Sequence, residues 1–305
     1  MCMNRRGRKD LCLILCGMLV WFLADAKRLR LAAACGLTLC AGTVIPALFP
    51  FMAVTGLLVQ LGFGQWMAPH MAGLMAPLFR LPGCAGSALL LGLVGGYPIG
   101  ARTAAELYAS GYLTRQEAER LLTFCNNSNP VFLISVLGVG IFGSVRRGLW
   151  LWLIHVGSAL VTGVLFRGLG RGRRTVPAAA SFQAVSFPKA FVSAVREAAV
   201  GMLSVCAFVT LFYVLVSPLT ALPGPLAALA VGCAELFSLT PLLDASRLSF
   251  ILAAGCAGWG GLSVLCQTAA VLDGTDLSLR PCLLGKLTQG ILSAAAAWGL
   301  SFWLF

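Results

Sequence analysis

The sequence predicts an all-α fold, a polytopic membrane helix bundle with about eight to ten membrane segments in two pseudo-repeated halves that contain discontinuous or re-entrant helices. Composition is the first reason: 59% of the 305 residues are hydrophobic and 10% are charged, with a mean hydropathy of +0.91. Soluble domains carry about 25% charged residues. A chain this apolar cannot cover a globule with polar surface. The second reason is that apolar stretches approaching or exceeding ~20 residues recur along its whole length.

The first apolar stretch, Leu11–Ala24, follows a basic cluster at 5–9 and precedes another at 27–30. This order is similar to a signal peptide, but no small-residue cleavage site follows. We favour an uncleaved first helix that crosses or only dips into the membrane, with a removed signal as the alternative.

The later apolar stretches are separated by turn residues and one linker. Trp66–Phe79 is short enough to be re-entrant, and Thr114–Glu117 is a capping box that begins a helix turning apolar at Leu121. The expected segments are Leu31–Phe63, Trp66–Phe79, Gly83–Ala105, 114–143, Trp150–Phe166, 188–199, Ala198–Ser217, Pro225–Leu243, Leu248–Leu272 and Cys282–Phe305.

We divide the chain into four parts. They are the basic tail with the first hydrophobic segment (1–30), a first half (31–143), a span with a basic linker and an amphipathic helix (144–200), and a second half (201–305).

The net charge of +12 comes from basic residues that cluster at segment ends. The positive-inside rule explains such clusters, and it makes the linker over 168–188 cytoplasmic. We therefore expect membrane lipids as partners and no nucleic acid, with binding of a protein partner as the alternative. We also allow for a homo-oligomer.

The stretch Gly92–Arg102, GLVGGYPIGAR, interrupts an apolar segment that is long enough to span. Gly95, Gly96 and Pro98 remove helix-favouring side chains and one backbone amide, so we expect a discontinuous helix. Unwound chain survives in lipid only against protein or a water-filled cavity. Secondary transporters place their binding sites at such discontinuous helices.

A half-helix that restarts at Ile99 would aim free amides and a partial positive charge at the break, which suits an anion. Tyr97 lies in the break, and Arg102 lies one turn into the restarted helix, where it would hold a carboxylate. The alternative is that Arg102 reaches to the membrane interface and the glycines only allow close helix packing.

A second glycine break, Gly258–Gly261, lies in the second half. About thirty residues after each break comes a polar patch in an apolar segment, Asn126–Asn129 in the first half and Thr288–Gly290 in the second. The two patches have the same spacing in the sequence as the two breaks. This agreement suggests an internal repeat, which chance could also produce.

The run Cys125–Pro130 places Asn126, Asn127 and Asn129 before an apolar stretch. Amide groups can hydrogen-bond a ligand or coordinate Na⁺ without carrying charge. A polar helix cap at the interface is the alternative.

Three further polar residues lie inside predicted spans. Glu235 is expected to bind a coupling ion or to pair with Lys286 or Arg102, because an acid in a membrane segment is costly and usually functional. Lys286 lies near the start of its segment, where it can instead reach the interface. Gln267 is a candidate ligand group. The two histidines, His70 and His155, are expected to be packing residues.

Catalytic and cofactor motifs are absent from the sequence. There is no phosphate-binding G-x-x-x-x-G-K-[ST] loop and no cluster of metal ligands, so we expect no enzyme activity, no metal and no cofactor beyond a coupling Na⁺ or H⁺. The expected substrate-binding residues are Gly95, Gly96, Tyr97, Pro98, Arg102, Asn126, Asn127, Asn129, Gly260, Gly261 and Gln267, with Glu235 and Lys286 as ion-coupling or charge-pair residues.

The motifs GLVGGYPIGAR, LTRQEAERLL and FCNNSNPVFL together resemble the sporulation integral membrane protein family of YlbJ type. That family belongs with the nucleoside-recognition, or Gate, domain proteins, which are similar to concentrative nucleoside transporters. The stretches AELFSLT and AGWGGLSVLCQT resemble its C-terminal half, so the resemblance makes both halves Gate-like.

The resemblance implies an integral protein of a bacterial cell membrane, placed in the outer forespore membrane during sporulation. It also implies that the substrate is dipicolinic acid, a small aromatic dianion, moved from the mother cell toward the forespore. Our leading hypothesis is therefore a secondary or facilitative transporter of a small organic anion. The alternatives are a non-transporting scaffold or receptor in spore cortex or coat assembly, and a nucleoside-type transporter.

Overall fold

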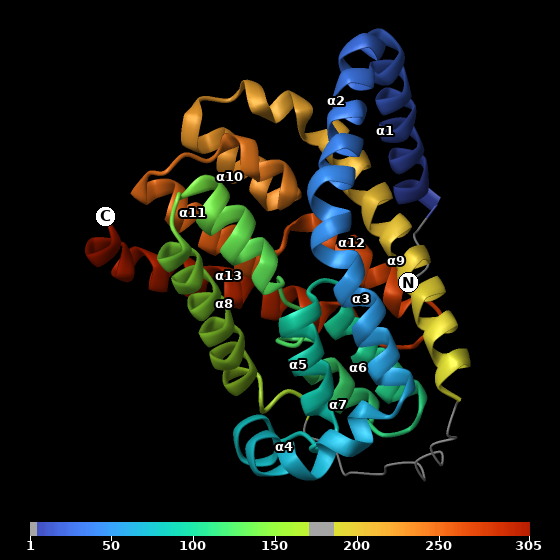
Figure 1. Ribbon diagram of the computed structural model, residues 1–305. Helices are drawn as coiled ribbons and strands as arrows, with labels where there is room; N and C mark the ends of the chain where they lie inside the picture. The colour runs from blue at the N-terminus through green and yellow to red at the C-terminus, as the bar shows by residue number, and fades with distance from the viewer. Residues whose placement is uncertain (1–4, 171–185) are drawn as a thin grey trace.

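The computed structural model describes residues 5–170 and 186–305, and these residues form helices with no strand among them (Figure 1). Helices α1 (Arg5–Ala24) and α2 (Ala26–Leu39) form a hairpin. Helix α2 continues through the π-helix η1 (Cys40–Val44) into α3 (Ile45–Gln60) as one rod. The predicted all-α class is confirmed.

The remaining elements follow in chain order. They are α4 (Phe63–Phe79), α5 (Ala85–Gly95), α6 (Ile99–Ala109), α7 (Arg115–Leu121), η2 (Val131–Ile141), α8 (Val145–Leu165), α9 (Phe187–Val216), η3 (Ser217–Ala221), α10 (Gly224–Ala234), η4 (Phe237–Leu242), α11 (Arg247–Trp259), α12 (Gly261–Leu272) and α13 (Arg280–Leu304).

Helix α9 packs along α2 and α3, while α13 packs against α11 and α8 and runs across the middle of the bundle in the view of Figure 1. Small residues allow α13 to come this close to its neighbours. A Cβ placed on Gly258 of α11 would lie 2.9 Å from the Cα of Gly290 in α13, so the two backbones nearly touch at that crossing. This crossing fixes the middle of α13 against α11.

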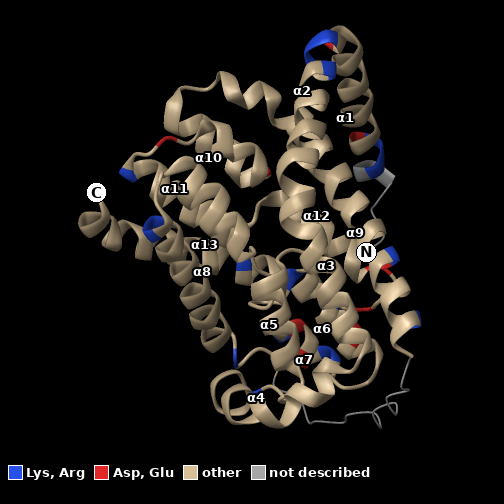
Figure 2. Ribbon diagram, viewed as in Figure 1, with Lys and Arg blue, Asp and Glu red and all other residues tan. Residues whose placement is uncertain are grey.

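Four helical stretches in the described ranges are long and apolar enough to cross a membrane: Ala26–Gln60, Val145–Leu165, Phe187–Ala221 and Arg247–Leu272. Three shorter apolar helices, α5, η2 and α10, accompany them. The predicted count of eight to ten segments is therefore not confirmed. Figure 2 shows long stretches of helix without a charged residue, as in α3, α4 and α10.

The capping box is confirmed, since the Thr114 hydroxyl accepts from the Glu117 amide and the Glu117 carboxylate accepts from the Thr114 amide. The helix that it starts was predicted to run on into the apolar stretch, and this is wrong. Helix α7 ends at Leu121, because the asparagine run after it bonds to other helices and Pro130 supplies no amide.

Two other predictions are not tested by the fold. The basic linker over 168–188 lies largely outside the described residues. The internal repeat also stays a prediction, although both glycine breaks on which it is based are present.

The close approach of α13 gives a stability prediction. A Cβ on Gly285 would lie 2.0 Å from the carbonyl oxygen of Thr123, so Gly285→Ala requires a backbone shift costing ~1–3 kcal/mol. The helix-propensity gain of Ala over Gly, about 1 kcal/mol, offsets part of this cost. We expect a lower thermal unfolding midpoint in detergent.

Gly299→Ala is the matched control in the same helix, because nothing lies within 4 Å of its Cβ position. It should leave the unfolding midpoint unchanged or raise it slightly. Equal midpoints for the two variants would contradict the packing described here.

Candidate functional site

The first break separates α5 from α6 and contains Gly96, Tyr97 and Pro98. Gly96 has a φ of 84°, in the left-handed region that favours glycine. All three residues are buried, so the interrupted backbone lies inside the protein. The break predicted from the GLVGGYPIGAR stretch is present.

The second break separates α11 from α12 at Gly260 and Gly261, which have φ values of 87° and 91°. Both glycines are buried. The candidate membrane-crossing stretch Arg247–Leu272 thus consists of two half-helices that meet inside the protein.

A third break was not predicted. The segment Pro225–Leu243 was expected to be one span, but α10 ends at Ala234 and the chain turns at Glu235 before η4. The Glu235 carboxylate accepts a hydrogen bond from the Ser238 amide and so caps the restarting turn.

The predicted pairing of Glu235 with Lys286 or Arg102 is wrong. Within the described residues, Glu235 forms no ion pair, although it is 1% exposed. The physical reason is local: its carboxylate satisfies backbone amides that the third break leaves without helical partners.

The three breaks contact one another. The Tyr97 hydroxyl, from the first break, donates to the carbonyl oxygen of Ala257 at 3.0 Å. In a continuous helix that carbonyl would accept from Gly261, so the tyrosine replaces the bond that the second break removes. A Cβ on Gly261 would in turn lie 3.4 Å from the Cα of Glu235 in the third break.

The asparagine run between α7 and η2 is buried and bonds to several helices. Asn126 donates from Nδ2 to the Thr268 hydroxyl of α12 at 2.9 Å. Asn129 donates from Nδ2 to the Ala47 carbonyl of α3 at 2.9 Å. A Cβ on Gly96 would lie 2.9 Å from the Cβ of Asn129, so this run also packs on the first break.

The same run reaches α8 and α13. The Ser128 amide donates to Nε2 of His155 at 3.1 Å, and Gln289 donates from Nε2 to Oδ1 of Asn127 at 2.9 Å. We call residues 126–129 the asparagine hub, because its bonds join α3, α8, α12 and α13.

Lys286 of α13 is fully buried beside the hub. Its Nζ donates to the Asn126 carbonyl at 2.9 Å and to Oε1 of Gln289 at 2.7 Å. It also lies 4.9 Å from the centroid of the Tyr97 ring. Lys286 therefore connects the hub with the first break.

Three polar atoms of this region are buried without a hydrogen-bond partner in the described chain: Oδ1 of Asn126, Oγ of Ser128 and Nδ1 of His155. Such atoms are uncommon in native proteins and call for an explanation, such as a ligand or water.

A small pocket lies in the same region, lined among others by Tyr97, Ser128, Asn129 and Gln267. Its volume of about 10 Å³ leaves room for roughly one water molecule. The centre is therefore closed to any larger ligand in this conformation.

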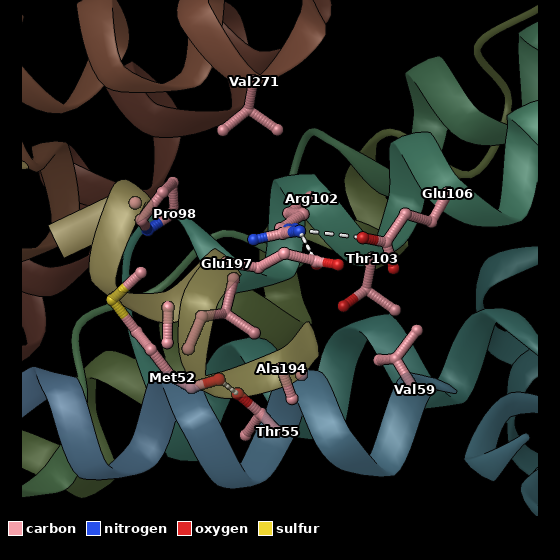
Figure 3. A pocket seen from close by; sticks show the side chains of 14 residues that line it. Met52, Thr55, Val59, Pro98, Arg102, Thr103, Glu106, Ala194, Glu197 and Val271 are labelled. Carbon is pink, nitrogen blue, oxygen red and sulfur yellow. Dashed lines mark hydrogen bonds and ion pairs between the residues drawn. The ribbon is translucent and has the colours of Figure 1, made fainter. Parts of the chain in front are cut away.

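Arg102 lies elsewhere. It lines a second pocket of about 60 Å³ between α3, α6 and α9, where its guanidinium bonds to Glu106 at 2.9 Å and to Glu197 (Figure 3). Glu197 also accepts from Gln60 and Ser193. With two carboxylates around one guanidinium, Arg102 holds α6 to α9 and is already neutralised.

The predicted site residues thus separate into two groups. Tyr97, Asn129 and Gln267 line the central pocket, and most of the other hub and break residues lie beside them. Pro98 and Arg102 line the other pocket. Two polar residues that bond to the hub, His155 and Thr268, were not predicted as site residues, and His155 was expected to be a packing residue. Neither has a sequence signal, because each is a single polar residue in an apolar helix.

Comparison with known proteins finds a family match in the first half. Residues 41–145 match the family model Gate, described as nucleoside recognition. The match includes the first break and the hub but not the second and third breaks or Lys286. The chain is also 28% identical to the sporulation integral membrane protein YlbJ of Bacillus subtilis (strain 168), over 86% of this chain and 75% of that protein.

The resemblance drawn from the sequence is confirmed. The chain is an integral membrane protein similar to YlbJ, and we call residues 41–145, which match the Gate model, the Gate region. No solved structure matches this chain.

The bond between the first two breaks gives the next prediction. Tyr97→Phe keeps the ring but leaves the Ala257 carbonyl buried without a partner, which should lower the free energy of unfolding by ~1–3 kcal/mol. Thermal unfolding in detergent measures this effect.

Tyr213→Phe is the control, because the Tyr213 hydroxyl has no hydrogen bond to the described chain. It should be neutral within ~0.5 kcal/mol. A neutral Tyr97→Phe variant would mean that the hydroxyl does not hold the breaks together.

Proposed function

We propose that this protein is a secondary or facilitative transporter that moves a small organic anion through the point where the three breaks meet. One observation carries the proposal: three interrupted segments, far apart in the chain, are buried and in contact. Interrupted backbone in a membrane protein is tolerated where it lines a binding site or a path for solute.

The starts of two helices support an anionic substrate. Helices α6 and α12 both begin at a break, and a helix N-terminus carries roughly +0.5 of an elementary charge on its free amides. Neither start has a side-chain cap, although the Ile99 amide donates to the Gly96 carbonyl. The other first-turn amides would have to supply the contacts to a ligand.

The substrate that we favour is dipicolinic acid, moved from the mother cell toward the forespore across the outer forespore membrane. The family resemblance supplies this substrate, and the name of the similar B. subtilis protein supports a role in sporulation. A planar dianion also suits a site that combines helix N-termini with an aromatic ring, that of Tyr97.

Transport requires the closed centre to open. Because the Tyr97–Ala257 bond joins the first break to the second, separation of α5 and α6 from α11 and α12 would break it and enlarge the pocket. Rocking of the two halves about the hub would then open the site first to one side of the membrane and then to the other.

A nucleoside-type substrate is the second candidate. The Gate region is described as nucleoside recognition, and amide side chains such as Asn126 and Gln289 can hydrogen-bond the edge of a base. A scaffold role in spore assembly would leave the breaks as packing devices.

Purified protein in liposomes that enclose Tb³⁺ tests the proposal, because dipicolinate entering the vesicles forms a luminescent chelate. We expect uptake above that of empty liposomes. Asn126→Ala should reduce uptake at least ~10-fold, since one well-placed hydrogen bond to a charged group is worth ~1.5–3 kcal/mol.

Thr288→Ala is the control, because Thr288 is only half-buried on α13 and its hydroxyl bonds within its own helix. Competition with uridine separates an organic-anion transporter from a nucleoside transporter, because only a nucleoside site should lose dipicolinate uptake when uridine is added. Wild-type protein that moves neither dipicolinate nor uridine would favour the scaffold, and unchanged uptake by Asn126→Ala would remove the hub from the site.

A further inference from the structure

Lys286 is a buried cation whose partners are all neutral. Its ammonium group contacts a backbone carbonyl, the amide oxygen of Gln289 and the ring of Tyr97. No Asp or Glu of the described chain lies within 4.0 Å of it. A charge placed in a protein interior without a counter-ion is strongly unfavourable.

Arg102 is in the opposite situation. Its guanidinium has two carboxylate partners and is about one-third exposed. A ligand carboxylate at Arg102 would have to displace Glu106 or Glu197, whereas at Lys286 it would supply the missing negative charge.

Donors near Lys286 also lack acceptors. Nε2 of His155 accepts from the Ser128 amide, so the neutral ring carries its proton on Nδ1, which has no partner in the described chain. The Ser128 hydroxyl is likewise without a partner. Gln289 connects Lys286 to His155 and to Asn127, so these groups form one network.

We propose that Lys286, and not Arg102, binds a carboxylate of the transported anion, and that the Tyr97 ring covers the ammonium group while the site is closed. This inference rests on the proposed function and assigns the cation of that same site. Tyr97 lines the central pocket on one side and faces Lys286 on the other.

The position of Tyr97 in the first break explains how its ring can give way to a ligand carboxylate at Lys286. Its hydroxyl is held by the Ala257 carbonyl of α11. When α5 and α6 move away from α11, the bond breaks and the ring leaves the ammonium group. A carboxylate entering the enlarged pocket then accepts from Nζ and replaces the ring as its partner.

Binding of dipicolinate to the full chain in detergent, measured by calorimetry, tests this inference without requiring transport. Lys286→Met keeps the length and removes the charge, and it should weaken binding roughly 10- to 100-fold. Lys286→Arg should retain most of the affinity, because it keeps a cationic donor. Arg102→Gln should bind like the wild type.

Thermal unfolding of the ligand-free variants separates a binding role from a structural one. Lys286→Met should unfold close to the wild-type temperature, because removal of an uncompensated buried charge offsets the loss of the donor to the Asn126 carbonyl and to Oε1 of Gln289. Added dipicolinate should raise the unfolding temperature of the wild type and of Arg102→Gln, but not that of Lys286→Met.

Three outcomes overturn the inference. The first is a Lys286→Met variant that binds dipicolinate as tightly as the wild type, and the second is an Arg102→Gln variant that loses binding. A wild type that binds the dimethyl ester of dipicolinate as well as the dianion would show that no cation recognises a carboxylate. If the wild type binds neither compound, the anion substrate of the proposed function fails together with the role of Lys286.

Discussion

The rest of the structure depends on one constraint: inside a membrane protein, each backbone group that leaves a helix needs a partner from the protein itself. Three segments leave their helices in the interior of this chain. Tyr97 of the first break replaces the bond lost at the second, whereas Glu235 caps the turn after the third from within its own segment. The first two breaks therefore depend on each other for a hydrogen bond, which is one reason why they lie together.

The asparagine hub extends this mutual dependence to the whole bundle. Asparagine side chains and the Ser128 backbone amide connect α3 and α8 on one side with α12 and α13 on the other. Since the hub is in the Gate region and α12 and α13 are outside it, the hub is the joint between the matched part of the chain and the remainder. Motion of the two parts relative to each other must rearrange hub bonds, so ligand binding at the hub and opening of the bundle are physically coupled.

The sequence predicted those features that depend on local chemistry. The glycine breaks, the capping box at Thr114 and the buried polar run all follow from the conformational preferences of Gly, Pro, Thr and Asn. The third break was missed because Ala234–Glu235–Leu236 contains neither Gly nor Pro. It exists because Glu235 can cap the next turn and because Gly261 packs against it, and the second reason is a tertiary contact that no local pattern contains.

The two basic residues show most clearly where sequence reasoning ends. Arg102 was favoured as the anion ligand because it is one turn beyond a glycine break, and Lys286 was given less weight because it is near a helix start. Both positions are as predicted, but electrostatic partners decide their roles. Glu106 is on the same helix as Arg102, four residues on, whereas Glu197 comes from α9, almost a hundred residues away. That distant carboxylate completes the neutralisation of Arg102.

Lys286 is enclosed by the Asn126 carbonyl of the hub, Gln289 and Tyr97, none of which carries a charge. A cation that is enclosed but has no charged partner lies beside the first break, so its own charge dominates the electric field in that part of the protein.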